Sequence, residues 1–135
     1  MLSDHPAMPC LAVRDLGRAR EFYEQTLGFR RMEVPGLDDA EGMGVVYATK
    51  QGGMLVYPSS YAGTNQATAV TFQVPGDAFD AEVAALRSGG VEFQTFELPS
   101  GSWSDGVLTD GAMRSVWFAD PDGNILNVET AAAAA

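Results

Sequence analysis

The sequence predicts an α+β fold in which a single domain, residues 1–135, contains two tandem βαβββ modules. Three observations support this prediction. Apolar runs of strand length outnumber helical patterns, and each of the two helical patterns follows a strand and ends at glycine. The length of 135 residues and the 46% of hydrophobic residues suit one globular domain. The modules should cover residues 7–58 and 67–130.

The first module begins with an apolar strand over Pro9–Val13. Asp15 then provides a side-chain cap for an amphipathic helix that ends at Gly28, because apolar residues recur at helical spacing between them. Three further strands follow in the order of the predicted module: Phe29–Val34, Gly44–Thr49 and Met54–Tyr57. They are separated by a loop over Pro35–Gly42 and a turn over Gln51–Gly53.

The second module repeats this order with little residue identity. Ala67–Val74 is the first strand, and Asp77 is the expected cap of a helix that carries Phe79, Val83 and Leu86 on one face. That helix should end at Gly89-Gly90. The remaining strands are expected over Val91–Phe96, Ala112–Ala119 and Asn124–Glu129, with a long loop over Glu97–Gly111 and a hairpin turn over Asp120–Gly123.

The composition excludes several classes of function. A formal net charge of −10 disfavours nucleic acid and anionic membrane surfaces as partners. Cys10 is the only cysteine, so no internal disulfide is possible, and a reducing, cytoplasmic location is expected. The N-terminus lacks the basic and apolar regions of a signal peptide, and no apolar run is long enough for a membrane helix. The alanines at 131–135 are expected to form a frayed tail.

Two motifs resemble those of the vicinal oxygen chelate superfamily, which contains glyoxalase, bleomycin-resistance and extradiol dioxygenase-like proteins. The first consists of Val13-Arg14-Asp15-Leu16, Glu21-Phe22-Tyr23 and Leu27-Gly28-Phe29. The second is Trp117-Phe118-Ala119-Asp120-Pro121-Asp122-Gly123-Asn124 before the last strand. The resemblance implies that the two modules curve into a mixed sheet with a cleft, as in glyoxalase and bleomycin-resistance proteins.

The resemblance also locates the four positions at which metal-dependent members hold a divalent ion, usually with His or Glu. In this chain those positions are Met8, Val56, Ala69 and Asn127, with a one-residue uncertainty at Val56. A thioether, two aliphatic groups and an amide cannot balance the charge of a hard dication. We therefore expect no metal ion and no other cofactor.

Alternation along the strands predicts a mostly apolar cleft that binds a small molecule. The candidate ligand-binding residues are Tyr57, Tyr61, Trp103, Trp117, Asn127, Met8, Thr71 and Glu129. Trp103 is either a wall of the pocket or an anchor that holds its loop to the domain or to a partner subunit. Asp120 and Asp122 resemble cation ligands, but their spacing around Pro and Gly is what a tight turn needs.

Three hypotheses for function follow. The first is a metal-free protein that binds an aromatic or drug-like ligand, as implied by the antibiotic-sequestering members of the superfamily. The alternative is a lyase, isomerase or dioxygenase with a non-standard metal site, or with none and Glu129 as general base. The third is an interaction or structural protein whose cleft is filled by its own side chains. A homodimer is expected under all three, because proteins of this type often complete their clefts by pairing.

Overall fold

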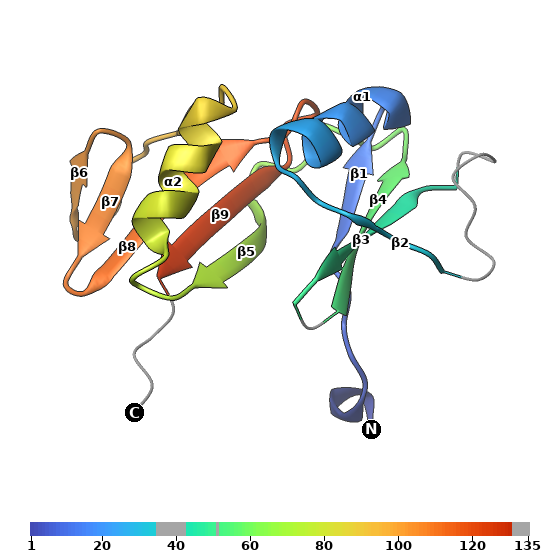
Figure 1. Ribbon diagram of the computed structural model, residues 1–135, viewed down its shortest axis with the longest axis horizontal. Coiled ribbons are helices and arrows are strands. Elements are labelled where there is room, and N and C mark those ends of the chain that lie inside the picture. The colour runs from blue at the N-terminus through green and yellow to red at the C-terminus, as the bar shows by residue number, and fades with distance from the viewer. Residues whose placement is uncertain (35–42, 51, 131–135) are drawn as a thin grey trace.

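The computed structural model describes residues 1–34, 43–50 and 52–130 as two sheets, each with one helix packed on it (Figure 1). A short helical turn over Leu2–Asp4 precedes the first sheet. The expected two-module α+β fold is confirmed. The loop predicted over Pro35–Gly42 and the alanines at 131–135 lie outside the described residues. No helix in the described part of the chain is long and apolar enough to cross a membrane.

The first sheet has four strands in the order β1-β4-β3-β2. They are β1 Cys10–Val13, β2 Arg31–Met32, β3 Val45–Thr49 and β4 Gly52–Pro58. β1 pairs with β4 in parallel, and the other neighbours are antiparallel. Gly52 and Gly53, predicted in a turn, belong to β4 instead. A Cβ on Gly53 would come within 2.8 Å of Val46, so glycine allows the two strands to pack closely there.

The second sheet has five strands in the order β5-β9-β8-β7-β6. They are β5 Thr68–Val74, β6 Ser102–Ser104, β7 Val107–Asp110, β8 Met113–Ala119 and β9 Ile125–Thr130. β5 and β9 pair in parallel, as β1 and β4 do in the first sheet. The parallel outer pair in each sheet is the structural form of the repeat predicted from the sequence.

The outer edge of β8 shows where the sequence prediction was wrong. Val91–Phe96 does not form a strand, and only Gln94 makes a bridge, to Trp117. The segment predicted as a long loop contains the hairpin β6–β7. β7 pairs with the remaining part of the same β8 edge, where Leu108 lies opposite Ser115. These strands are too short and too rich in Gly, Ser and Asp for alternation to reveal them.

The first helix begins where the sequence predicts. The Asp15 carboxylate accepts a 3.1 Å hydrogen bond from the Arg18 N–H and caps α1, Leu16–Arg20. The helix then widens into a π-helical segment, Glu21–Thr26, in which the Leu27 N–H donates to the carbonyl of Phe22. It ends at Gly28, whose φ of 77° is a left-handed conformation that favours glycine.

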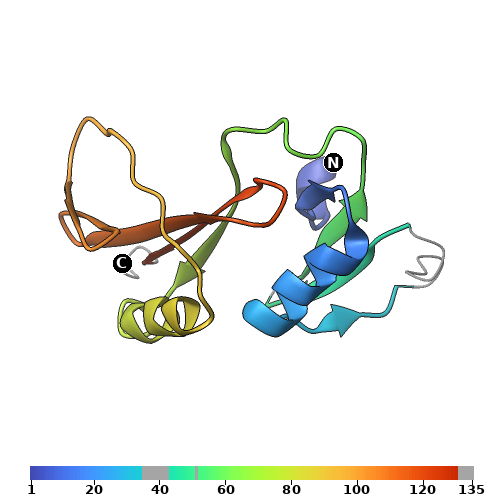
Figure 2. The same ribbon diagram turned by 90° about the horizontal axis from the view of Figure 1, so that it is seen from above.

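The second helix, α2, spans Phe79–Ser88. Its cap is Ala78, with no side-chain hydrogen bond, so the prediction that Asp77 caps this helix was wrong. The predicted apolar face is confirmed: Phe79 and Val83 are buried, and Leu86 packs against the core. Figure 2 shows α1 and α2 side by side along one side of the molecule.

One hydrophobic core joins the two modules on the helix-facing sides of both sheets. It includes Leu11 and Val56 of the first sheet, Val116 and Leu126 of the second, and Tyr23 between them. Alternation places the intervening strand residues on the opposite, outer face of each sheet. The core therefore packs against one face of each sheet, and the two outer faces are not part of it.

The turn between β8 and β9 is held by its own first aspartate. The Gly123 N–H donates to the Asp120 carbonyl at 3.1 Å, and Oδ1 of Asp120 accepts from the N–H groups of Asp122 and Asn124. This is the hairpin turn that the sequence predicts. The side chains of Asp120 and Asp122 are buried, as is that of Asn124, so the turn is an internal feature.

The same turn also bonds to the first module. Oδ1 of Asp122 accepts from the backbone N–H of Arg14 at 3.1 Å and from Nη2 of Arg18 at 3.0 Å. Nδ2 of Asn124 donates to the Ala12 carbonyl at 2.8 Å. We call this set of contacts, together with the Tyr23–Asp120 hydrogen bond, the module joint. The aspartates that resemble cation ligands in the sequence serve the turn and the joint.

Candidate functional site

The outer face of the second sheet brings together most of the predicted ligand-binding residues. Trp117 lies opposite Asn127, and Asn127 opposite Thr71, so these three form one row across β8, β9 and β5. A second row, one pleat further along, runs from Trp103 through Leu108 and Ser115 to Glu129 and Gln73. Phe118 is buried in the core, which confirms that Trp117 faces the other way.

Three aromatic rings gather on this face. The Phe96 ring lies 4.9 Å from that of Trp117 and 5.5 Å from that of Trp103, both edge-on, and the two indoles lie 5.9 Å apart. Both tryptophans are partly exposed, and 42% of Phe96 is exposed. We call these residues the aromatic triad. Trp103 packs against its own domain, and it also presents part of its ring to solvent.

The triad forms because the chain crosses from one side of the sheet to the other. After α2 the chain leaves the helix side, makes the Gln94–Trp117 bridge and passes over the outer face before β6 (Figure 2). Phe96 is carried on this crossing segment, two residues beyond the bridge. Sequence analysis did not assign it to the site, because a predicted strand over Val91–Phe96 gave no reason to place its ring over Trp117.

Asn127 is the buried polar group at the centre of this face. It is 3% exposed, and its Nδ2 donates to Oγ of Ser115 at 2.6 Å and to the Val116 carbonyl at 3.0 Å. These two bonds fix the orientation of the amide. Its Oδ1 accepts no hydrogen bond from the described residues, and this atom is not completely enclosed by the protein. Oδ1 is therefore the atom of Asn127 that remains as an acceptor for a ligand.

Glu129 places a carboxylate on the same face. Nε2 of Gln73 donates to its Oε1 at 3.2 Å, which holds the side chain over β5 and β9. Glu129 is partly buried, whereas Thr71 and Gln73 are exposed. The outer face thus combines aromatic rings, an oriented amide, a hydroxyl and one positioned carboxylate, which is a suitable lining for a small organic ligand.

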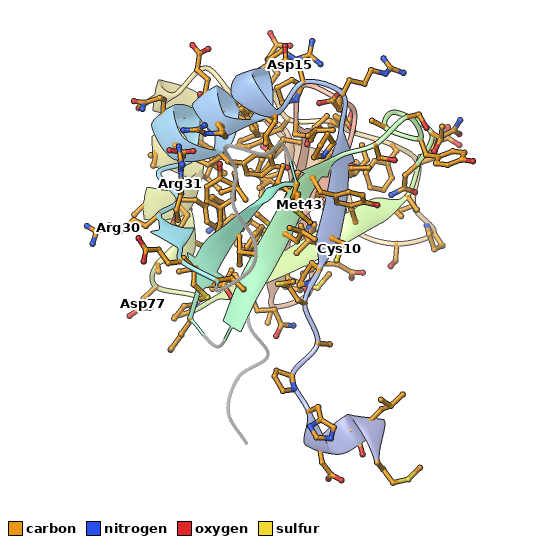
Figure 3. The ribbon with its side chains drawn as sticks, turned by 90° about the vertical axis from the view of Figure 1, so that its right-hand side faces the viewer. Cys10, Asp15, Arg30, Arg31, Met43 and Asp77 are labelled. Atoms are coloured by element: carbon orange, nitrogen blue, oxygen red, sulfur yellow. The ribbon has the colours of Figure 1, made fainter. Side chains whose placement is uncertain are left out.

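The remaining predicted residues lie elsewhere. Met8, Cys10 and Tyr57 share the outer face of the first sheet, where Cys10 pairs with Leu55 and Ala12 with Tyr57. Figure 3 shows this sheet from the side away from the second module, with Cys10 on β1. Tyr61 is in the linker and is 76% exposed. Among the described residues no hydrogen bond, ion pair or ring contact joins the outer faces of the two sheets.

Several hollows lined by described residues lie outside this face. One of about 510 Å³ is lined by Phe22, Thr26, Ala119 and residues 89–94. It opens where the Val91–Phe96 segment separates from β8. A smaller one of about 230 Å³, lined mainly by apolar groups, lies between the modules beside Phe29 and Phe72. Neither has an oriented buried polar side chain comparable to Asn127, so the outer face of the second sheet remains the candidate site.

The donor chemistry of the four superfamily metal positions does not fit a hard dication. Val56 is fully buried on the helix side, so the strand-4 position on the outer face is Leu55 or Tyr57, one residue away from the prediction. Ala69 lies at a bulge of β5 and packs against the core. Met8 and Asn127 add only a thioether and an amide. Throughout residues 1–34, 43–50 and 52–130, no group of three or more His, Cys, Asp or Glu side chains is arranged to hold a metal ion.

Comparison with known proteins agrees with the geometry of the fold. The family described as Glyoxalase/Bleomycin resistance protein/Dioxygenase superfamily matches residues 3–128. No curated protein sequence matches the chain. An integron cassette protein from the mobile metagenome of Halifax Harbour sewage outfall has a similar structure, with a TM-score of 0.64 and 21% identity. That alignment covers 94% of this chain and 100% of the other.

Two further structures show the same fold. A glyoxalase/dioxygenase from Nostoc punctiforme aligns with a TM-score of 0.65 and 19% identity, over 91% of this chain and 88% of that chain. A mutant of the fosfomycin resistance protein FosX from Listeria monocytogenes, complexed with Mn(II) and a dihydroxypropylphosphonic acid, aligns with a TM-score of 0.68 and 13% identity. It covers 96% of this chain and 93% of its own. At these identities the likeness establishes the fold alone.

Proposed function

Since the chain belongs to the Glyoxalase/Bleomycin resistance protein/Dioxygenase superfamily, we propose that it binds a flat aromatic small molecule on the outer face of its second sheet, without a metal ion. The aromatic triad is the observation that carries this proposal. Three rings within 6 Å of one another on a partly exposed sheet face provide a large apolar surface at little cost in side-chain entropy.

The polar groups support a binding role. Asn127 is buried, oriented by two donated hydrogen bonds and left with a free acceptor, which suits the recognition of one polar atom of a ligand. The donor set at the superfamily metal positions supports binding without a metal. A carbonyl or phosphoryl group would find no divalent ion held by carboxylate or imidazole there.

Tryptophan fluorescence tests this proposal, because Trp103 and Trp117 are the only tryptophans and both belong to the triad. A panel of planar aromatic compounds should contain members that quench the emission saturably at one equivalent per chain. Trp103→Ala and Trp117→Ala should each weaken binding at least about tenfold, as hot-spot aromatic residues do. Tyr61→Ala is the control, since Tyr61 is exposed in the linker. Unchanged affinity in both tryptophan variants would refute the proposal.

Glu129 favours a second candidate, a metal-free enzyme of the same superfamily. Its carboxylate lies on the face that carries Asn127 and the triad, where it could accept a proton from a bound substrate. This candidate predicts turnover that survives EDTA and disappears in Glu129→Gln. A non-standard metal site built from Cys10 and Glu129 has less support, because no contact among the described residues brings the outer faces of the two sheets together.

We also propose that the protein is a cytoplasmic homodimer. The outer face of the first sheet supports pairing, because it is apolar and partly open, with Met8 44% exposed and Cys10 a free, exposed thiol. Sedimentation equilibrium under reducing conditions tests the assembly. A dimer that dissociates in Met8→Glu would locate the interface, and a monomer at all concentrations would exclude it.

A further inference from the structure

We infer that the ligand of the aromatic triad is a planar aromatic cation that carries an N–H donor. This inference rests on the proposed binding function and specifies its chemical class. It follows from three independent features of the outer face of the second sheet: its charge, the hydrogen-bond acceptor of Asn127 and its aromatic surfaces.

The charge of the second module is strongly one-sided. Residues 67–130 contain ten acidic residues and two arginines, Arg87 and Arg114. Neither arginine serves the outer face. Arg114 donates to Asp80 at 2.8 Å and lies over the ring of Phe79, on the helix side of the sheet. Arg87 bonds to Asp105 and lies over the ring of Phe93. The carboxylate of Glu129 therefore has no described cation beside it on its face.

The partners of Glu129 leave it free to attract a cation. Its one hydrogen bond among the described residues comes from the neutral amide of Gln73, which orients Oε1 but does not neutralise the charge. Glu129 is also partly buried, so water screens it less than a fully exposed carboxylate. A positive group of a ligand would supply the missing counter-charge.

Asn127 adds a directional requirement. Both N–H bonds of its amide are used within the protein, by Ser115 and Val116, so the group it presents to a ligand is the acceptor Oδ1. A ligand N–H satisfies this acceptor, whereas a ligand carbonyl or carboxylate would be repelled by it. Asn127 and Glu129 alternate along β9 on the same face, so one ligand can contact both.

The aromatic triad completes the match. The faces of indole and phenyl rings carry negative electrostatic potential and attract cations, most strongly in the case of Trp. In an edge-on pair, as Phe96 makes with each tryptophan, the edge of one ring covers one face of the other, so a planar partner would stack on the opposite face. A flat cation gains from stacking, from the ring potential and from Glu129 together.

The experiment compares planar probes of similar shape and different charge: proflavine, a cation with N–H groups near neutral pH; acridine, which is neutral there; and anthracene carboxylate, an anion. Binding is followed by tryptophan quenching and by calorimetry on the full chain. We expect proflavine to bind at least about tenfold more tightly than acridine, a factor typical of one charge pair plus one hydrogen bond. Anthracene carboxylate should bind weakest.

Glu129→Gln keeps the size of the side chain and an acceptor for Gln73, and it removes only the charge. It should weaken proflavine about tenfold and leave acridine unchanged. Asp77→Asn is the matched control, because it removes one exposed charge from the turn before α2 and should alter neither affinity. The melting temperature of each variant checks folding.

The outcomes separate this inference from the proposed function. Equal binding of proflavine and acridine, both dependent on Trp103 and Trp117 and both insensitive to Glu129→Gln, would leave the binding function standing and overturn the cation. If no probe binds in a way that depends on Trp103 and Trp117, both the proposed function and the inference are wrong. Selective loss of proflavine in Glu129→Gln, with Asp77→Asn unchanged, would establish the inference.

Discussion

Oη of Tyr23 donates a 2.8 Å hydrogen bond to Oδ2 of Asp120, which lies 97 positions later in the chain, and both groups are buried at the module joint. The bond connects the π-helical segment of the first module to the hairpin turn of the second. Burial raises the pKa of the Tyr23 phenol far above its usual value, and the neighbouring Asp120 carboxylate raises it further.

Tyr23→Phe should lower the free energy of unfolding by about 1–3 kcal/mol, because the Asp120 carboxylate loses a donor where water cannot replace it. Urea denaturation followed by circular dichroism measures the change. Tyr61→Phe removes an exposed hydroxyl and is the control. Equal stability of wild type and Tyr23→Phe would show that the bond contributes nothing to the joint.

The Tyr23 phenol should also make the protein sensitive to alkali. Its folded pKa lies above the unfolded value of about 10, so the folded state holds this proton more tightly. The resulting stability is complete below about pH 10 and declines as pH rises toward the folded pKa. The stability gap between wild type and Tyr23→Phe should therefore shrink above about pH 10. A gap that stays constant in urea titrations across that range would contradict the prediction.

The ion pair between Arg18 and Asp122 should respond unequally to loss of its two partners. The side chain of Asp122 is fully buried and that of Arg18 is 51% exposed. Arg18→Met would leave the buried Asp122 carboxylate without its cation, with the Arg14 N–H as the remaining donor to Oδ1, at a cost of about 3 kcal/mol. Asp122→Asn removes the buried charge and keeps an acceptor for the Arg14 N–H, at a cost of about 1 kcal/mol.

The double variant tests this reasoning. The free energy of unfolding of the double variant, Arg18→Met with Asp122→Asn, should lie within a few tenths of a kcal/mol of that of Asp122→Asn alone. The reason is that no buried charge is then left unpaired. Urea midpoints of all four proteins measure the coupling. Strict additivity of the two single changes would show that the residues do not interact.

The β6–β7 hairpin should be held by Gly101. This glycine has a φ of 91°, and a Cβ there would come within 2.9 Å of Leu108 and 3.0 Å of the Thr109 carbonyl. Gly101→Ala should displace the hairpin and weaken ligand binding at Trp103 while the rest of the sheet stays folded. Gly111→Ala is the matched control, since its φ is also positive at 61° but nothing lies within 4 Å of the added Cβ. Binding that falls equally in both variants would point to backbone strain alone.

Divalent metals should have no effect on this protein. Incubation with manganese, iron, nickel or zinc should leave less than about a tenth of an equivalent bound after dialysis, the level of adventitious contamination. The melting temperature and the affinity for aromatic probes should be unchanged by EDTA. One equivalent of a single metal, measured by mass spectrometry, would contradict the argument from the donor set.

Local patterns predicted the parts of the fold that depend on local rules. The Asp15 cap, the left-handed Gly28 and the buried face of α2 each follow from a few neighbouring residues. Alternation along β8 and β9 correctly placed Trp117 and Asn127 on the face opposite Phe118. The common face of Trp117, Asn127 and Thr71 could therefore be predicted from the sequence, whereas the row through Trp103 and Leu108 could not, because β6 and β7 lie in the predicted loop.

The features that sequence reasoning missed depend on distant residues or very short elements. β6 has three residues, which is too few for alternation to be recognised. Phe96 belongs to the site only because the chain crosses the sheet after the Gln94–Trp117 bridge. The roles of Asp120 and Asp122 in the joint are set by Tyr23, Arg14 and Arg18, about a hundred positions earlier.

The module joint also has a consequence in time. Ala12 and Asn124, whose hydrogen bond is part of it, are separated by 112 positions. At ribosomal rates of about 5–20 residues per second, roughly 6–22 seconds pass between their syntheses. The whole first module is made during that interval, before the turn to which it bonds. The module joint can therefore close only after the turn before β9 has been made, and the first module lacks these contacts until then.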